Sequence, residues 1–581
     1  MSTCYLALIN GDGDWSESSP VEMESKLRDI GLHPCLSSTS FRLFVTRDTP
    51  ILSLPGVGTI LGNMFFRDGT PIAYAEQLLA FADPAQIRKY IVENCWGPYL
   101  LLQPEVEGRG IVVLRNPSAS GDIPCLYSIR DGTGFITSDI SLPERLGIYR
   151  RKIDWNVISH RLLYPQLKSA RTALYDIQEL LPGCILQLER SKIATHTAWS
   201  PWSFVSPGSR HSNPKEAAAE VRYAVSSAVQ ALANMGQAIL LELSGGLDSS
   251  IIGACLQNSN ARVVCTTLVT TVPGADERHY ATQIAHQLGV ELRAATLRLD
   301  EARFDFPVPP QCTMPRIGTI QHAVDEVMLA AGQRENVDSF FSGGGGDTVF
   351  SYLETAAPAA DAFRERGAMA CLAAARNLAT LHGCTFWKAG QLTIRKLRRP
   401  PPMTRAPDRF LLAENVTDMP PDIHPWNEPP VDALPGDRER IRGLATCQAY
   451  RDSLARGVDR EMHMPLLSQP VMEACLRAPS WMWISEGQNR AIARKAFADT
   501  LPVDILKRRS KGTFMGYLGA VYRRNREQMR DYLVNGQLQA QGLLDADAIR
   551  CLMANDLPPR GHPFIRIFDL CMIDNWARRQ S

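Results

Sequence analysis

The feature that most constrains this chain is a Ser/Gly segment placed directly after an apolar run. Residues 238–243 are typical of a buried strand, and Ser244 to Ser250 (Ser-Gly-Gly-Leu-Asp-Ser-Ser) lead into an expected helix over 249–257. Adjacent glycines let backbone N–H groups converge on an anion, serine hydroxyls add donors, and the positive end of the helix points at the same place. The segment predicts a phosphate-binding loop; a plain strand-to-helix turn is the alternative.

Asp248 is the one acidic residue of this loop. A carboxylate repels phosphate, so its presence is explained if Mg²⁺ stands between the two. The loop differs from the Walker pattern, because it lacks Gly-Lys-Ser/Thr. The residues expected to bind the nucleotide here are Leu243, Ser244, Gly245, Gly246, Asp248, Ser249 and Ser250.

The pattern of the sequence changes near residue 205, and 581 residues are too many for a single core. Before that point, short apolar runs broken by Gly, Pro and Asp predict a β-rich α+β domain over residues 1–205. After it, strands alternate with helices, which predicts a parallel sheet covered by helices within a second domain, 206–581. The expected strands of this sheet are 237–243, 262–270 and 337–341, and the expected helices are 215–235, 249–257 and 276–288.

Composition excludes several classes of protein. Lys and Arg total 62 against 61 Asp and Glu, so the net charge of +1 predicts no nucleic-acid partner. No apolar run approaches the roughly 18–20 residues needed to cross a bilayer, and residues 1–10 lack a secretory signal. The 14 cysteines are scattered without a CxxC pair, as is typical of reduced thiols. Together these features predict a cytoplasmic enzyme.

The loop at 244–250 resembles the pyrophosphate loop of the N-type ATP pyrophosphatases, and later segments resemble the asparagine synthetase family. Residues 342–347, Ser-Gly-Gly-Gly-Gly-Asp, follow an apolar strand where the family has S-G-x-G-x-D. The resemblance implies an adenine-nucleotide α-hydrolase-like fold that uses ATP and Mg²⁺. The residues that it implies in the site are Val269 beside the adenine, Ser342 and Gly343 on the nucleotide, and Asp347 with Asp248 on the metal.

Two later segments extend the resemblance. Residues 461–467 (Glu-Met-His-Met-Pro-Leu-Leu) resemble the family's E-x-R-x-P-F-L, and residues 508–512 (Arg-Arg-Ser-Lys-Gly) resemble its R-x-K-G. By this match Lys511 holds pyrophosphate and the developing charge, a task that suits a compact ammonium group. A solvated basic loop is the alternative for Lys511, and Glu461 is either a catalytic carboxylate or an ion-pair partner.

The first domain resembles the family's glutaminase half in residues 96–99, 115–127 and 181–183, which implies an Ntn-glutaminase-like fold. Glutamine-using members begin, after Met removal, with a Cys whose own α-amine activates its thiol. Here Met1, Ser2 and Thr3 precede Cys4. We therefore expect domain 1–205 to keep the fold and to have lost ammonia production.

Gly344 is the second departure from the family. Asparagine synthetases have Glu there and β-lactam synthetases have Tyr, so the glycine predicts a wider acceptor side. Four glycines in a row, 343–346, are costly in backbone entropy and predict a close approach to a ligand; a flexible loop is the alternative. The relatives that the chain resembles most are the lasso-peptide cyclases, whose loop is similarly Ser-Gly-Gly-Gly-Gly-Asp.

This resemblance implies an enzyme that adenylates an Asp or Glu side chain of a precursor peptide and joins it to the peptide's N-terminal amine, giving a macrolactam. The implied partners are the precursor peptide, a leader-peptide-binding protein and a leader peptidase. An asparagine synthetase, a β-lactam-synthetase-like ligase and a non-catalytic biosynthetic scaffold are the alternatives.

Overall fold

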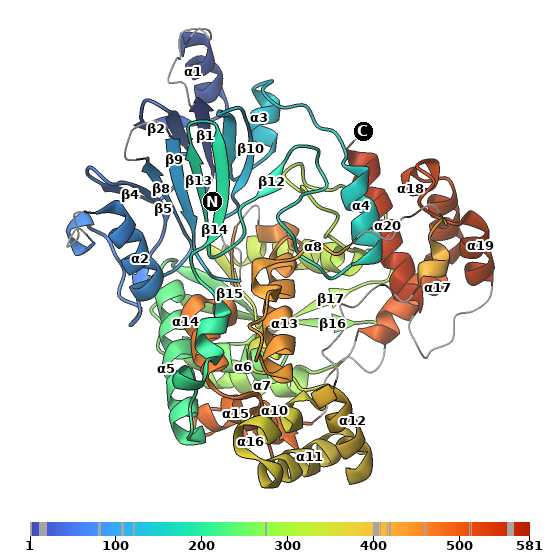
Figure 1. Cartoon of the computed structure of the whole chain (residues 1–581). Coiled ribbons are helices and arrows are strands. Elements are labelled where there is room, and N and C mark those ends of the chain that lie inside the picture. The colour runs from blue at the N-terminus through green and yellow to red at the C-terminus, as the bar shows by residue number, and fades with distance from the viewer. Residues whose placement is uncertain are drawn as a thin grey trace.

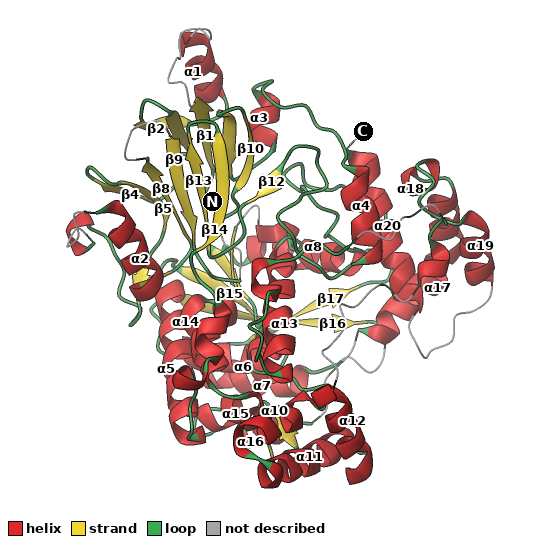
Figure 2. Cartoon of the chain, viewed as in Figure 1, coloured by secondary structure: helices red, strands yellow, loops and turns green. Residues whose placement is uncertain are grey.

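Strands dominate the first third of the chain and helices the rest (Figure 2). The computed structural model describes residues 3–10, 20–78, 83–105, 110–119, 123–272, 276–398, 406, 408–414, 416, 420–457, 460–509, 512, 514–554 and 563–580, with backbone alone for 20–24 and 451. No helix among these residues is both long enough and apolar enough to span a membrane.

Two six-stranded antiparallel sheets pack face to face in the N-terminal half (Figure 1). Because side chains alternate along a strand, Tyr5, Ala7 and Ile9 face the second sheet, where they meet Leu100 and Val113 in one core. The first sheet has the order β12 (Gln178–Glu179), β10 (Leu126–Arg130), β11 (Thr133–Thr137), β1 (Tyr5–Asn10), β3 (Phe41–Val45), β2 (His33–Ser37). The second has the order β14 (Lys192–Thr197), β13 (Cys184–Glu189), β9 (Gly110–Arg115), β8 (Tyr99–Pro104), β5 (Gly58–Gly62), β4 (Ile51–Leu54).

A five-stranded parallel sheet forms the centre of the second half. Its order is β17 (Leu292–Leu297), β16 (Arg262–Thr270), β15 (Ala238–Glu242), β18 (Ser339–Phe341), β19 (Glu461–His463). The chain adds strands in one direction from β15 to β17 and then crosses back to β18. This change of direction between β15 and β18 leaves a crevice at the carboxyl ends of the two strands, where ligands bind in folds of this kind.

Helices cover both faces of the parallel sheet: α6 and α7 lie on one side and α8 on the other (Figure 1). Helices α10, α11 and α12 enclose a small core of their own, and α17 to α20 pack with α4 in another. The longer helices are α1 (Pro20–Asp29), α2 (Pro84–Asn94), α4 (Trp155–Leu163), α5 (Pro214–Ala233), α6 (Leu247–Leu256), α7 (Arg278–Gln287), α8 (Thr319–Arg334), α10 (Ala357–Arg366), α11 (Ala368–His382), α12 (Phe386–Arg398), α13 (Pro435–Arg451), α14 (Gln469–Arg477), α17 (Met515–Val534), α19 (Ala546–Ala554) and α20 (Pro563–Arg579). The short ones include α9 (Gly346–Val349), α15 (Ala491–Ala496), α16 (Val503–Lys507) and α18 (Gln537–Ala540).

The predicted fold class is confirmed: a β-rich α+β half of antiparallel sheets precedes a parallel α/β sheet. The three predicted strands of the parallel sheet are present, but β17 and β19 were not foreseen, since β17 is half exposed and β19 has three residues. The apolar run 59–66 is two strands, β5 and β6 (Phe65–Phe66), because Gly62 turns the chain with φ +89°. The boundary at residue 205 stays a prediction.

Buried ion pairs join the two halves of the chain. The ammonium of Lys168 donates to Glu179 Oε2 at 2.5 Å and to Asp452 Oδ2 at 2.7 Å, and Arg115 donates to Glu179 Oε1 at 2.8 Å. The Lys168 side chain is 2% exposed. Although burial opposes it, the two cations hold the pKa of Glu179 well below its usual range. Asp452 directly follows α13, so these contacts fix one end of that helix.

Replacing Lys168 by Met should destabilise the protein by about 3–5 kcal/mol, because buried Glu179 and half-buried Asp452 lose their shared cation. The matched control is Lys89→Met, which removes an exposed pair with Glu93 at 3.9 Å and should cost less than about 1 kcal/mol. Urea unfolding of both variants measures the difference. Equal free energies of unfolding would show that the buried network contributes nothing to stability.

Candidate active site

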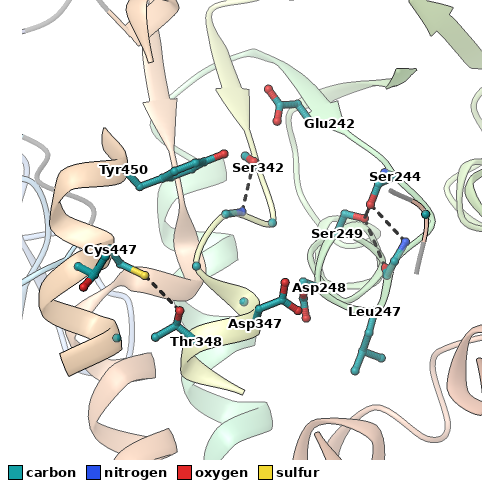
Figure 3. Close-up of a pocket in the computed structure, with 18 of the residues that line it drawn as sticks. Glu242, Ser244, Leu247, Asp248, Ser249, Ser342, Asp347, Thr348, Cys447 and Tyr450 are labelled. Atoms are coloured by element: carbon teal, nitrogen blue, oxygen red, sulfur yellow. Dashed lines mark hydrogen bonds between the residues drawn. The ribbon is translucent and has the colours of Figure 1, made fainter. Parts of the chain in front are cut away.

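The first loop of the site follows β15 and closes on itself through serine hydroxyls. Ser249 Oγ accepts from the Ser244 amide at 3.3 Å and lies 3.1 Å from Ser244 Oγ (Figure 3). The Gly246 amide donates to Ser244 Oγ at 3.3 Å. Gly245 has φ +72°, and a Cβ there would lie 2.6 Å from Tyr280 Cβ. Glycine is therefore required at 245 both by the turn and by the packing of α7.

The second loop follows β18 and lies against the first. A Cβ on Gly343 would be 2.8 Å from the Ser249 amide nitrogen, and one on Gly346 would be 2.4 Å from Asp248 Cγ. Gly345 adopts the left-handed conformation with φ +81°. The glycines were expected to allow a close approach to a ligand. In the structure, glycine is needed at 343 and 346 for a different reason: it lets the two loops of the protein approach one another.

Asp248 and Asp347 come together at this junction, as Figure 3 shows. One nitrogen, Arg490 Nη1, lies 3.1 Å from both carboxylate oxygens of Asp248 and 3.2 Å from Asp347 Oδ1. The two carboxylates are therefore near enough to share one cation. In the described part of the chain, no group of three or more His, Cys, Asp or Glu residues could hold a metal. Two carboxylates fit Mg²⁺, which commonly takes one or two carboxylates and completes its shell with phosphate oxygens and water.

These loops open into a cavity of about 1140 Å³. It extends from the Ser/Gly loop past α13 and α12 to the N-terminal half, which contributes Arg161, Pro165 and Gln166 to its wall. Arg316 joins that wall to the second half by donating to the Leu167 carbonyl at 2.9 Å. The volume exceeds the roughly 300–1,000 Å³ of ordinary small-molecule pockets.

Most of the predicted site residues line this cavity. Those that do are Leu243, Ser244, Gly246, Asp248, Ser249, Ser342, Gly343 and Asp347. Gly245, Ser250, Val269 and Glu461 are not among the described residues of the lining. From β16 the lining takes Thr266, Thr267 and Leu268 instead. Glu461 begins β19, where its carboxylate is 3.3 Å from His463 Nε2. Lys511 lies outside the described residues.

Two arginines near the loops were not given a role by the sequence. Arg508 donates to the Gly245 carbonyl at 3.0 Å, pairs with Glu277, and stacks 4.1 Å over the Tyr280 ring. Arg490 bridges the aspartates. Arg508 stands in the segment 508–512 that resembles the family, but sequence alone assigned the pyrophosphate charge to Lys511. A guanidinium held against a phosphate loop can neutralise a departing pyrophosphate just as well.

Tyr450 fills the space beside Gly344. A Cβ on Gly344 would lie 2.9 Å from Tyr450 Cε1 and 3.0 Å from Met464 Sδ. The expected widening at Gly344 is therefore absent next to the glycine, because an aromatic ring from α13 occupies that space. Desolvation inside the cavity, then the charge of Glu242, raises the pKa of Tyr450, although 40% of the residue remains exposed. No signal in the sequence links Tyr450 to Gly344, since the contact exists only after the helix has packed.

Behind the cavity wall, Arg456 is paired with Glu242 and with Asp325, whose Oδ1 is 3.2 Å from Arg456 Nη1. Asp325 Oδ2 accepts from the Ala455 amide at 2.6 Å. Burial raises the pKa of Asp325 to about 6, because the attraction of Arg456 does not fully offset the loss of solvation.

Cys4 lies in a separate cavity of about 180 Å³ between the halves, with Ser138, Asp139 and Cys312. Its backbone nitrogen donates to Thr49 Oγ1 at 3.4 Å. Burial and the charge of Asp139 raise the pKa of the Cys4 thiol. A thiol with a raised pKa has little thiolate and is a poor nucleophile at neutral pH.

The parallel sheet, its two glycine-rich loops and the paired aspartates define a nucleotide-binding enzyme. The sequence profile of the family described as asparagine synthase matches residues 220–578, more than half of the chain. The chain therefore belongs to the asparagine synthase family and is an ATP-dependent, AMP-forming ligase of carbon–nitrogen bonds.

No curated protein matches the chain in sequence. Among solved structures, an allosteric regulatory enzyme of purine biosynthesis is similar over 51% of this chain and 74% of its own, with 9% identity and a TM-score of 0.20. The glutamine phosphoribosylpyrophosphate amidotransferase from B. subtilis, in complex with ADP and GMP, is similar over 59% and 84%, with 9% identity and a TM-score of 0.20. At such TM-scores neither similarity bears on the argument.

Replacing Gly343 by Ala should weaken ATP binding and destabilise the protein by about 1–3 kcal/mol, because the new methyl group pushes the loops apart. The matched control is Gly390→Ala in α12, where a Cβ meets nothing within 4 Å. That change should stabilise the protein by about 0.5–1 kcal/mol, since alanine loses less entropy in a helix. Calorimetric titration with ATP and thermal unfolding check both. Unchanged ATP affinity in the Gly343 variant would contradict the close approach.

Because of the Asp325 carboxyl, the free energy of unfolding should fall as pH rises from about 4 to about 6. Its pKa is raised in the folded state, so its contribution is complete below pH 4 and is lost as pH passes the folded value. The shift corresponds to at most about 3 kcal/mol. Urea unfolding of wild type and Asp325→Asn across this range isolates the effect. A difference between the two that does not change with pH would refute the raised pKa.

Proposed function

We propose that this ligase closes a macrolactam: it adenylates an Asp or Glu side chain of a precursor peptide and joins it to the peptide's own N-terminal amine. The cavity of about 1140 Å³ is the observation that carries the proposal. The nucleotide loops occupy only one end of it, and the rest runs between α12, α13 and the N-terminal half. Aspartate and ammonia do not need such space, whereas a folded peptide does.

The chemistry of the walls supports a peptide. Beyond the nucleotide loops, Arg161, Lys396, Glu439 and Arg442 line the cavity. Lys396 pairs with Glu439, and Glu439 also accepts from Thr355 at 2.6 Å. Charged groups of both signs suit the backbone amides and side chains of a peptide. The raised pKa of the Cys4 thiol supports an enzyme that does not make ammonia and takes its nitrogen from the substrate.

In the first step, a carboxylate oxygen of the peptide bonds to the α-phosphorus of ATP, and the bond from that phosphorus to the pyrophosphate breaks. Loop amides, Arg508 and the predicted Lys511 offset the charge of the departing group. Mg²⁺ held by Asp248 and Asp347 would neutralise phosphate charge. In the second step, the amine nitrogen bonds to the acyl carbon, AMP leaves, and the amine gives up a proton.

The main contribution of the enzyme is to position the reacting groups of the peptide. A cavity that holds the peptide folded, with its amine beside the acyl carbon, turns a slow encounter into an intramolecular reaction. Enclosure also protects the adenylate from water. A leader-peptide-binding protein and a leader peptidase are the partners that such a reaction predicts.

The test uses synthetic peptides that carry one Asp or Glu at varied distances from a free N-terminus, with ATP and Mg²⁺. We expect AMP, pyrophosphate and a peptide that has lost one water, measured by chromatography and mass spectrometry. N-acetylated peptides should still release pyrophosphate and form the acyl-adenylate, but without ring closure. Asp248→Ala should lower AMP formation by about 10²-fold or more, whereas the exposed control Asp547→Ala should not change it.

Other outcomes would replace the proposal. Asparagine from aspartate and ammonia would identify an asparagine synthetase. Turnover of small amino-acid derivatives alone would identify a β-lactam-synthetase-like enzyme. No AMP from any carboxylate would favour a biosynthetic scaffold.

A further inference from the structure

Arg490 occupies the place between the two aspartates that a shared metal ion would take. Its Nη1 contacts Asp248 Oδ1 and Oδ2 at 3.1 Å and Asp347 Oδ1 at 3.2 Å. The side chains of Arg490 and Asp248 are 10% and 14% exposed, so the pair is largely removed from water. A guanidinium and a metal ion cannot both lie at this point.

Hydrogen bonds hold the backbone of Arg490 in place. Arg490 has φ +55° between β21 (Gln488–Asn489) and α15, and its carbonyl accepts from the Arg494 amide at 3.0 Å. Arg494 in turn donates to the Asn489 and Arg508 carbonyls at 3.0 and 3.1 Å. The guanidinium carbon lies 5.3 Å from the centroid of the Tyr352 ring. A flat aromatic face attracts a guanidinium without fixing it at one point.

We propose that Arg490 is a built-in counter-cation that keeps divalent metal out of the aspartate pair until the nucleotide arrives. This inference rests on the proposed nucleotide site. Without Arg490, the two carboxylates would lose the cation that they share in a partly buried place. Arg490 offsets their charge in the empty enzyme. When metal and nucleotide enter together, the metal takes the carboxylates and the phosphates offer the guanidinium a new anionic partner.

The consequence is an order of binding. Free metal must displace an ion pair that is already satisfied, and Arg490 would have no anion to move to. When the metal–nucleotide complex binds, its metal replaces Arg490 at the aspartates and its phosphates replace the aspartates at Arg490. Each charged group therefore keeps a partner of opposite charge. The enzyme therefore takes its metal with ATP and not before it.

The experiment measures binding of Mn²⁺ alone to the full chain by electron paramagnetic resonance, without nucleotide. Wild type should bind weakly at the aspartate pair. Arg490→Met should bind at least about tenfold more tightly, and the double variant Arg490→Met/Asp347→Asn should lose that gain. Arg490→Lys, which keeps a cation, should resemble wild type.

Thermal unfolding gives a second measure. Arg490→Met should have a lower Tm than wild type, and Mg²⁺ alone should restore it, whereas Mg²⁺ alone should leave the wild-type Tm unchanged. An Arg490→Met protein that folds normally and binds Mn²⁺ no more tightly than wild type would overturn the proposal, and Arg490 would be a phosphate ligand only. Neither measurement requires turnover, so failure of the macrolactam assay would leave this result standing, and the reverse also holds.

Discussion

The site depends on one packing constraint: the loops after β15 and β18 must touch. Parallel pairing of these neighbouring strands brings both carboxyl ends to the same edge, and the crossover of the chain there opens the crevice. Only glycine at 343 and 346 allows the second loop to reach the start of α6. That contact sets Asp347 beside Asp248, at the place where we propose that the nucleotide and its metal bind.

The charged side chains around this junction form ion pairs. The aspartates share Arg490, the first loop is backed by Arg508 and Glu277, and Arg456 pairs with Glu242 behind the wall. Each of these charges has an opposite partner, which avoids the large penalty of an unpaired ion. An enzyme that binds ATP needs cations near the phosphates, and these cations need anionic partners before the nucleotide binds.

The N-terminal half contributes to the wall of the site. Its Arg161, Pro165 and Gln166 close one side of the large cavity, and its Lys168 holds the end of α13 through Asp452. Helix α13 carries Tyr450 against Gly344. The part of the chain that resembles a glutaminase thus shapes one side of the large cavity.

The sequence by itself determined the class of fold and the phosphate loops, because strand patterns and glycine-rich turns are local and each carries its own signal. It also named Asp248 and Asp347 as a pair through family resemblance. Tertiary structure alone decided that Arg490 stands between them, that Tyr450 occupies the space beside Gly344, and that the glycines serve contact between loops. These facts join residues about 100 to 240 positions apart in the chain. Packing of whole elements creates such contacts, and no local pattern of residues records them.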